Sequence, residues 1–189
     1  MSIKIEDGKG QGYSVGVNSE NRILTESVSA SVEHHTNHHE KQAYNVYFEQ
    51  SPTANDDCIF YMVNNSSDAD ICIEGIWLDI SAACDVYFKI NDKGTRGSAT
   101  ALTPANLNGG SGHTADGTFE KGADLESGTL SGGTEFQRFS VRAAISTTSY
   151  NFEQDLILPK NSTMTIYCSA STATVKGTVI FNFHSKEQG

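Results

Sequence analysis

Short runs of alternating or continuous apolar residues, each bounded by turn-forming residues, make up most of the chain from residue 43 onward. Alternation with a period of two residues is typical of a half-buried strand, and a short continuous apolar run is typical of a buried one. The pattern predicts strands over residues 43–49, 58–63, 71–80, 85–90, 135–141, 152–158, 164–168 and 174–183. About eight strands joined by loops of uneven length favour an all-β fold, a jelly-roll-like β-sandwich. No long segment has a helical period, so we expect short helices or none.

The runs 71–80 and 85–90 are separated by a short connection, which predicts a hairpin. Large aromatic residues in the predicted strands are expected to form part of the buried core. These residues are Trp77, Phe88, Phe139, Phe181 and Phe183.

Residues 91–134 contain most of the glycine and few large apolar residues. A weakly patterned stretch of this length is either a functional loop or a set of strands that the pattern does not reveal. Phe119 and Leu125 favour hidden strands, yet the glycine-rich surroundings predict that Phe119 lies near the surface or against a partner.

The first 33 residues alternate strand-forming and turn-forming residues but contain too little apolar bulk to form a core. Such a segment can pair with the sheet edge of a neighbouring subunit, and we expect an extended N-terminal β-arm. The alternative is a β-hairpin that packs on its own domain. The pattern divides the chain into an arm with a His-rich connector, 1–42, and a β-sandwich domain, 43–189. The candidate partner-binding residues of the arm are Ile3, Ile5, Tyr13, Val15, Val17, Arg22, Ile23 and Leu24.

Charge and hydropathy narrow the possible partners, and the spacing of the cysteines indicates their state. The 13 basic and 23 acidic residues give a net charge of −10, and no basic cluster could follow a phosphate backbone, so we expect no nucleic-acid partner. No apolar stretch reaches the roughly 18 residues that span a bilayer, and a signal-peptide pattern is missing, so we expect synthesis in the cytoplasm and no membrane. The four cysteines have no C-x-x-C spacing and are expected to be buried free thiols.

Four histidines, His34, His35, His38 and His39, form the one group with metal-ligand chemistry. On a helix they would lie in pairs one turn apart, a spacing that can chelate a transition metal. An exposed polar connector is the favoured alternative, since no H-E-x-x-H pattern accompanies the run. A third possibility is pH sensing, because clustered imidazoles repel one another once protonated.

No set of residues suggests catalysis or a cofactor. Only His113 and His184 lie outside the histidine run, and nucleophile-elbow, Walker and dinucleotide motifs are missing. We therefore expect a protein that is not an enzyme and takes no cofactor.

Several turn-rich motifs resemble those of small structural proteins in tailed-bacteriophage virions. Residues 5–12, 17–23 and 43–45 resemble the opening of these proteins, and residues 158–162 resemble a late turn. The resemblance spans most of the chain but does not include the histidine run. It implies a virion location and a capsid decoration or cement protein that binds the outer surface of the phage head.

The resemblance implies that the partner is the major capsid protein or another virion protein. It also implies self-association into a homotrimer. A tail or collar adaptor is an alternative. A receptor-binding or carbohydrate-binding β-sandwich of the tail is another, for which exposed aromatic residues are expected in glycine-rich loops. Residues 91–134 offer only Phe119, which favours the head.

Overall fold

The computed structural model describes residue 37 and the ranges 41–142 and 146–185. The candidate residues of the arm and the histidine run lie outside these residues, so their roles and the domain division at residue 42 stay predictions.

The described chain is built from β-strands and one 3₁₀ turn. The strands are β1 (Ala43–Gln50), β2 (Asp57–Asn64), β3 (Ala69–Ile80), β4 (Cys84–Ile90), β5 (Thr100–Ala101), β6 (Ala105–Asn106), β7 (Gly117–Lys121), β8 (Thr134–Val141), β9 (Ser146–Leu158), β10 (Thr163–Cys168) and β11 (Val175–Ser185), and the 3₁₀ turn is η2 (Leu125–Ser127). The predicted strands are therefore confirmed within a few residues, apart from the start of β9. This strand begins at Ser146, and the pattern does not reveal its first half because the residues there are mostly polar.

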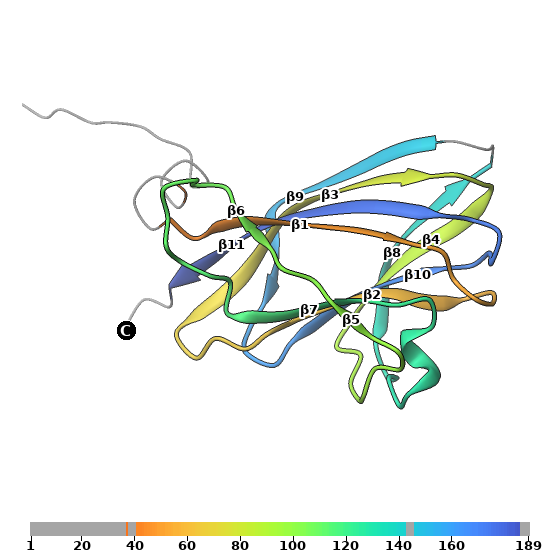
Figure 1. Ribbon diagram of the computed structural model, residues 1–189, viewed down its shortest axis with the longest axis horizontal. Helices are drawn as coiled ribbons and strands as arrows, with labels where there is room; N and C mark the ends of the chain where they lie inside the picture. Colours follow the sequence, from red (N-terminus) through yellow and green to blue (C-terminus); the bar gives the residue numbers. More distant parts are fainter. Residues whose placement is uncertain (1–36, 38–40, 143–145, 186–189) are drawn as a thin grey trace, which may run out of the picture. The chain divides into compact units, whose positions relative to one another are not determined.

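The strands form two antiparallel sheets that pack as a sandwich (Figure 1). The five-stranded sheet has the order β6-β1-β11-β3-β9, and the six-stranded sheet has the order β5-β7-β2-β10-β4-β8. The all-β sandwich expected from the pattern is confirmed.

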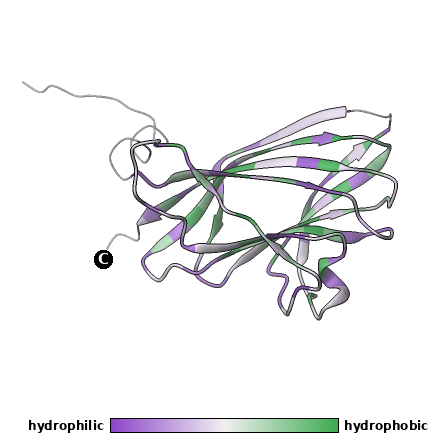
Figure 2. Cartoon of the chain, viewed as in Figure 1, coloured by the Kyte–Doolittle hydropathy of each residue, from purple (hydrophilic) through white to green (hydrophobic). Residues whose placement is uncertain are grey.

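The core lies between the sheets and is filled by alternate side chains of the strands. Phe48 of β1 stacks on Phe60 of β2 across the core, with 4.8 Å between ring centroids. The Phe48 ring lies against Gly177 of β11, where a Cβ atom would come within 2.2 Å of the ring, so this contact requires glycine. Figure 2 shows that the hydrophobic stretches follow the strands.

The predicted hairpin of residues 71–80 and 85–90 is wrong, because β3 and β4 belong to different sheets. The chain between them crosses the end of the sandwich beside the connection from β10 to β11. The Ser81 N–H donates to the carbonyl of Thr174 (3.0 Å), and the Thr174 N–H donates to Ser81 Oγ (2.8 Å). Each connection therefore satisfies a backbone N–H group of the other. In a β3–β4 hairpin, hydrogen bonds between the two strands would satisfy such groups.

Residues 91–134 contribute to the sandwich, and the expectation for Phe119 is wrong. β7 pairs with β2, and Phe119 is only 3% exposed. Its ring stacks on Phe181 with 5.1 Å between centroids. The strand was obscured because the residues on both sides of Phe119 are polar or glycine.

Trp77 is the other misassigned aromatic residue, since it is 41% exposed. Phe88, Phe181 and Phe183 are buried as expected, and Phe139 is partly buried against the core. All four cysteines are buried free thiols, as expected.

These positions predict opposite effects for two aromatic truncations. Phe119→Ala should lower the free energy of unfolding by about 3–5 kcal/mol, because it opens a cavity beside Phe181. Trp77→Ala should lower it by less, about 1–2 kcal/mol, because a large part of this side chain already faces solvent. Denaturant unfolding followed by circular dichroism measures both. A larger loss for Trp77→Ala than for Phe119→Ala would contradict this arrangement.

Candidate binding surface

Two exposed aromatic residues lie in one row across the outer face of the five-stranded sheet. Tyr47 of β1 pairs in register with Thr178 of β11, and Thr178 pairs with Trp77 of β3. Tyr47 is 54% exposed. Because β1 and β3 are separated by one strand, the two aromatic residues are roughly 10 Å apart at their Cα atoms. We call Tyr47, Thr178 and Trp77 the aromatic row.

The Trp77 indole reaches over Gly75, its neighbour on the same face of β3. A Cβ atom on Gly75 would lie 3.0 Å from Cη2 of the indole, a contact that requires the ring to shift. The missing side chain lets the indole lie over the backbone of β3, with part of its surface exposed to solvent.

A charged row runs beside the aromatic row, two residues away on each of the same three strands. Glu49 pairs in register with Lys176, and Lys176 with Asp79. Lys176 Nζ lies 3.6 Å from a Glu49 carboxylate oxygen, and both side chains are nearly half exposed. An ion pair this exposed contributes little to stability, so its charges remain available to a ligand.

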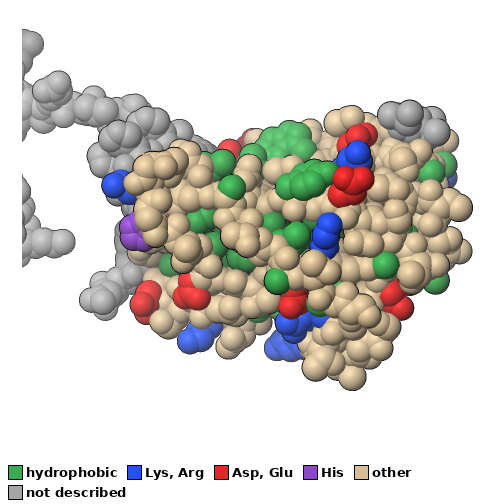
Figure 3. Space-filling model, in the orientation of Figure 1, with side chains coloured by type: hydrophobic (Ala, Val, Ile, Leu, Met, Phe, Trp, Pro, Cys, Tyr) green, Lys and Arg blue, Asp and Glu red, His purple; other side chains and the backbone are tan. Residues whose placement is uncertain are grey.

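Tyr47 connects the two rows. Its hydroxyl donates a hydrogen bond of 3.0 Å to Glu49. Desolvation, followed by the hydrogen bond to Glu49 and the charges of Glu49 and Asp79, raises the pKa of Tyr47, so the phenol is neutral at physiological pH. The space between the rows is a groove whose walls include Tyr47, Trp77, Asp79 and Lys176. Figure 3 shows hydrophobic side chains beside a group of acidic and basic ones on this face.

The outer face of the six-stranded sheet is different, because residues 91–133 pack against part of it. Leu125 and Leu130 are buried with three tyrosines of the sheet, Tyr61, Tyr87 and Tyr167. Cations stack on each tyrosine, which adds stability where the rings are partly desolvated. The distances from cation to ring centroid are 4.4 Å for Arg96 over Tyr61, 4.3 Å for Arg138 over Tyr87 and 4.0 Å for Lys89 over Tyr167.

Asp92 is fully buried in this second cluster and is satisfied by the chain itself. Its carboxylate accepts hydrogen bonds from Tyr167 Oη (3.0 Å), Thr165 Oγ1 (2.5 Å) and the N–H of Gly133 (2.7 Å). These bonds tie the end of the 91–133 segment to β10.

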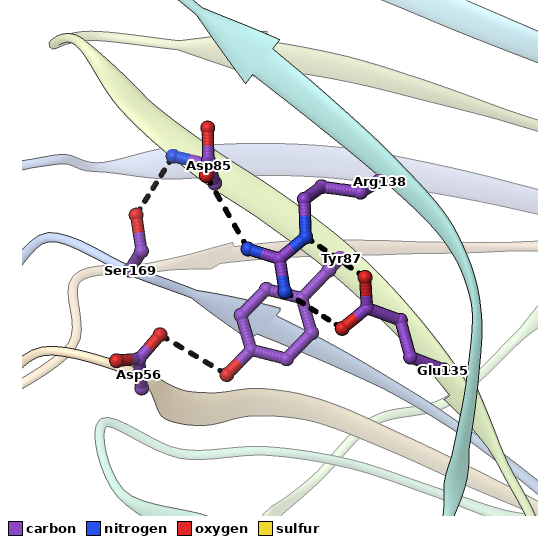
Figure 4. Close-up of polar contacts among 6 residues, drawn as sticks. All are labelled: Asp56, Asp85, Tyr87, Glu135, Arg138 and Ser169. Carbon is purple, nitrogen blue, oxygen red and sulfur yellow. Dashed lines mark hydrogen bonds and ion pairs between the residues drawn. The ribbon is translucent and has the colours of Figure 1, made fainter.

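Arg138 of β8 is likewise held within the chain (Figure 4). Its guanidinium donates two hydrogen bonds to Glu135 (2.8 and 2.7 Å) and one to Asp85 (3.3 Å). The Tyr87 ring lies under it and donates its hydroxyl to Asp56 (3.2 Å). The hydrogen bonds from Arg138 lower the pKa of Glu135, and those from Ser140 and then Arg138 lower that of Asp85. This network stabilises the sheet. Its charged groups already bond to one another, so they are less available to a ligand than those of the groove.

Three carboxylates, of Asp57, Asp124 and Glu126, have oxygens within 4.8 Å of one another. Asp57 accepts the backbone N–H groups of Thr53 (2.8 Å) and Ala54 (2.6 Å). Asp124 caps η2, and Glu126 accepts the N–H of Cys58. The three carboxylates therefore fasten loops, and we assign no ligand to them.

Comparison with protein-family models, with curated proteins and with solved structures finds no match for this chain. Among the residues that the structure describes, no helix is long and apolar enough to cross a membrane.

Residue type alone predicts a buried Trp77 and so does not reveal the groove. The alternation along β3 held the signal, since Gly75, Trp77 and Asp79 share one face while Ile76, Leu78 and Ile80 share the other. The same alternation puts Tyr47 on one face with Glu49.

Glu126 gives a pH-dependent prediction. Burial, followed by the charges of Asp57 and Asp124, raises the pKa of Glu126 above its ordinary value, although the bond from Cys58 opposes this. The ionised form therefore destabilises the folded state at neutral pH, and the penalty disappears as pH falls below the pKa of the unfolded chain.

Glu126→Gln keeps an acceptor for Cys58 and removes the charge. We expect a higher melting temperature than wild type at pH 7 and no difference below about pH 4, where Glu126 is protonated. Thermal unfolding of both proteins across this range is the measurement. A variant less stable than wild type at pH 7 would contradict the raised pKa.

Proposed function

We propose that this protein is a non-enzymatic structural protein of a tailed-bacteriophage virion that binds the outer surface of the head as a decoration or cement protein. The sequence motifs of residues 5–12, 17–23, 43–45 and 158–162 support the virion location. The protein would be made in the host cytoplasm and incorporated into the particle.

The strand order supports a jelly-roll form of the sandwich. Successive main strands alternate between the two sheets, apart from β4 and β8, and the first strand β1 lies beside the last strand β11. This winding is expected of two Greek keys combined in a jelly roll, an architecture common to viral capsid and lectin domains.

The observation that carries a role in assembly is the open edge formed by β8 and β9. Each is the last strand of its sheet, and no strand in the described residues pairs with the outer edge of the 13-residue β9. Aromatic side chains connect the two strands, with centroid distances of 6.0 Å for Phe136–Phe152 and 6.1 Å for Phe139–Tyr150. Tyr150 is 37% exposed. An unpaired strand edge with apolar side chains is a surface for another chain.

β9 also contains an irregularity along this edge. Asn151 pairs with Gly75 and Leu156 with Ile73, so residues 152–155 bulge opposite Glu74. Glu153 and Gln154 have φ angles of 50° and 69°, in the left-handed region. Gln154 Nε2 is buried without a hydrogen-bond partner in the described residues. The edge of β9 is therefore irregular at residues 152–155, where a strained backbone and an unsatisfied buried amide coincide.

A deletion of residues 1–33 tests the arm. The described body has its own core, so we expect it to remain folded with a nearly unchanged melting temperature but to lose binding to phage heads. Calorimetry and co-sedimentation with heads are the measurements. Loss of folding in the shortened chain would instead favour the hairpin that packs on its own domain.

A charge at the open edge tests self-association. We propose a homotrimer, because oligomerisation covers exposed strand edges. Light scattering should give a trimer for wild type and for Trp77→Ala, and a monomer for Tyr150→Lys. A wild-type monomer both alone and on heads would exclude the trimer.

A tail or collar adaptor remains the alternative for the same edge chemistry. Copy number separates the two, since protein staining of virions should give hundreds of copies for a head protein and a few for a tail protein.

The groove on the five-stranded sheet favours a second function, carbohydrate binding.

A further inference from the structure

We infer that the groove between the aromatic row and the charged row binds a neutral polysaccharide of the host cell surface. The binding itself follows from the chemistry of the groove, and only the source of the polysaccharide rests on the proposed virion location.

Trp77 provides the stacking surface. A pyranose ring has a face of C–H bonds and a rim of hydroxyl groups, so one face packs against an aromatic ring while the rim stays polar. The Trp77 indole lies over Gly75 and is 41% exposed, which leaves room for such a ring without unpacking the core. Tyr47 lies one strand further across and offers a second aromatic surface.

The charged row provides partners for the hydroxyl rim. The Glu49 and Asp79 carboxylates accept hydrogen bonds from hydroxyl groups, and Lys176 donates them. Thr147 and Thr178 add hydroxyl groups to the groove walls. Aromatic stacking with charge-assisted hydrogen bonds beside it matches the two kinds of surface on a sugar.

Charge decides which sugars fit. The row holds two acidic side chains and one basic one, on a protein whose net charge is −10. An anionic polysaccharide would be repelled, so the ligand is neutral. A protein partner on the same face would have to desolvate an uncompensated carboxylate, whereas hydroxyl groups satisfy it.

The spacing of the aromatic row sets the ligand length. With Cα atoms roughly 10 Å apart, Tyr47 and Trp77 cannot both stack on one sugar ring. The groove therefore favours an oligosaccharide over a monosaccharide.

Trp77 is the single tryptophan of the chain, so its fluorescence reports on this groove directly. Titration of the full-length protein with neutral hexaoses of glucose, mannose and galactose should give a saturable emission change for at least one of them. The corresponding monosaccharide should bind much more weakly. No saturable change with any neutral hexaose would overturn the inference.

Calorimetry with the hexaose that binds identifies the residues. Trp77→Ala should weaken binding at least tenfold, and Gly75→Ala should also weaken it because the new methyl group lifts the indole. Ile157→Ala is the matched control, since Ile157 is an exposed apolar residue of the same sheet, and its affinity should equal wild type. Circular dichroism checks that each variant is folded. Unchanged affinity in Trp77→Ala would contradict the assignment.

Head binding by the same variants separates this inference from the proposed function. Trp77→Ala should still co-sediment with phage heads. If it loses head binding and no hexaose binds wild type, the face is a protein interface, which overturns the inference and leaves the proposed function standing. If wild type binds a hexaose but no heads, the proposed function fails and the inference stands.

Discussion

Phe48, Leu78 and Val179 must face the core between the sheets, and because side chains alternate along a strand, Tyr47, Trp77 and Thr178 must face outward. A shift of one residue in any of the three strands would exchange core and surface positions, at a cost set by the buried aromatic and aliphatic side chains. The packing of Phe48 against Gly177 and Phe60 makes that exchange especially unfavourable. The aromatic row is therefore a consequence of core packing.

The two sheets differ in what covers their outer faces. Residues 91–133 bury Leu125 and Leu130 against the tyrosines of the six-stranded sheet, so β2 is buried on both sides. The five-stranded sheet keeps Tyr47 and Trp77 exposed. A segment that is poor in apolar residues thus decides which face of the sandwich can meet a ligand.

The sequence pattern located the main strands well because their apolar runs are bounded by turn residues, but it assigned burial less well. The continuous apolar run in 58–63 is typical of a strand buried on both faces, and in the structure residues 91–133 cover its outer face. Phe119 was misjudged because its polar neighbours hid a strand whose single large apolar side chain reaches the core. Trp77 was misjudged because residue type outweighed its alternation with Ile76 and Leu78.

Sheet membership could not be read from local pattern either. The short connection between β3 and β4 resembles a hairpin loop, and only its hydrogen bonds to Thr174, far along the chain, reveal the crossing between sheets. The open edge and the groove likewise combine residues from strands that are distant in sequence.

Quenching of the single tryptophan by acrylamide, a neutral quencher, tests most directly whether the five-stranded sheet presents an open aromatic face. With Trp77 on the outer face and 41% exposed, acrylamide should quench the folded protein readily, though less than it quenches the unfolded chain. A blue-shifted emission that resists acrylamide until the protein unfolds would put Trp77 in the core and contradict both the strand register and the groove.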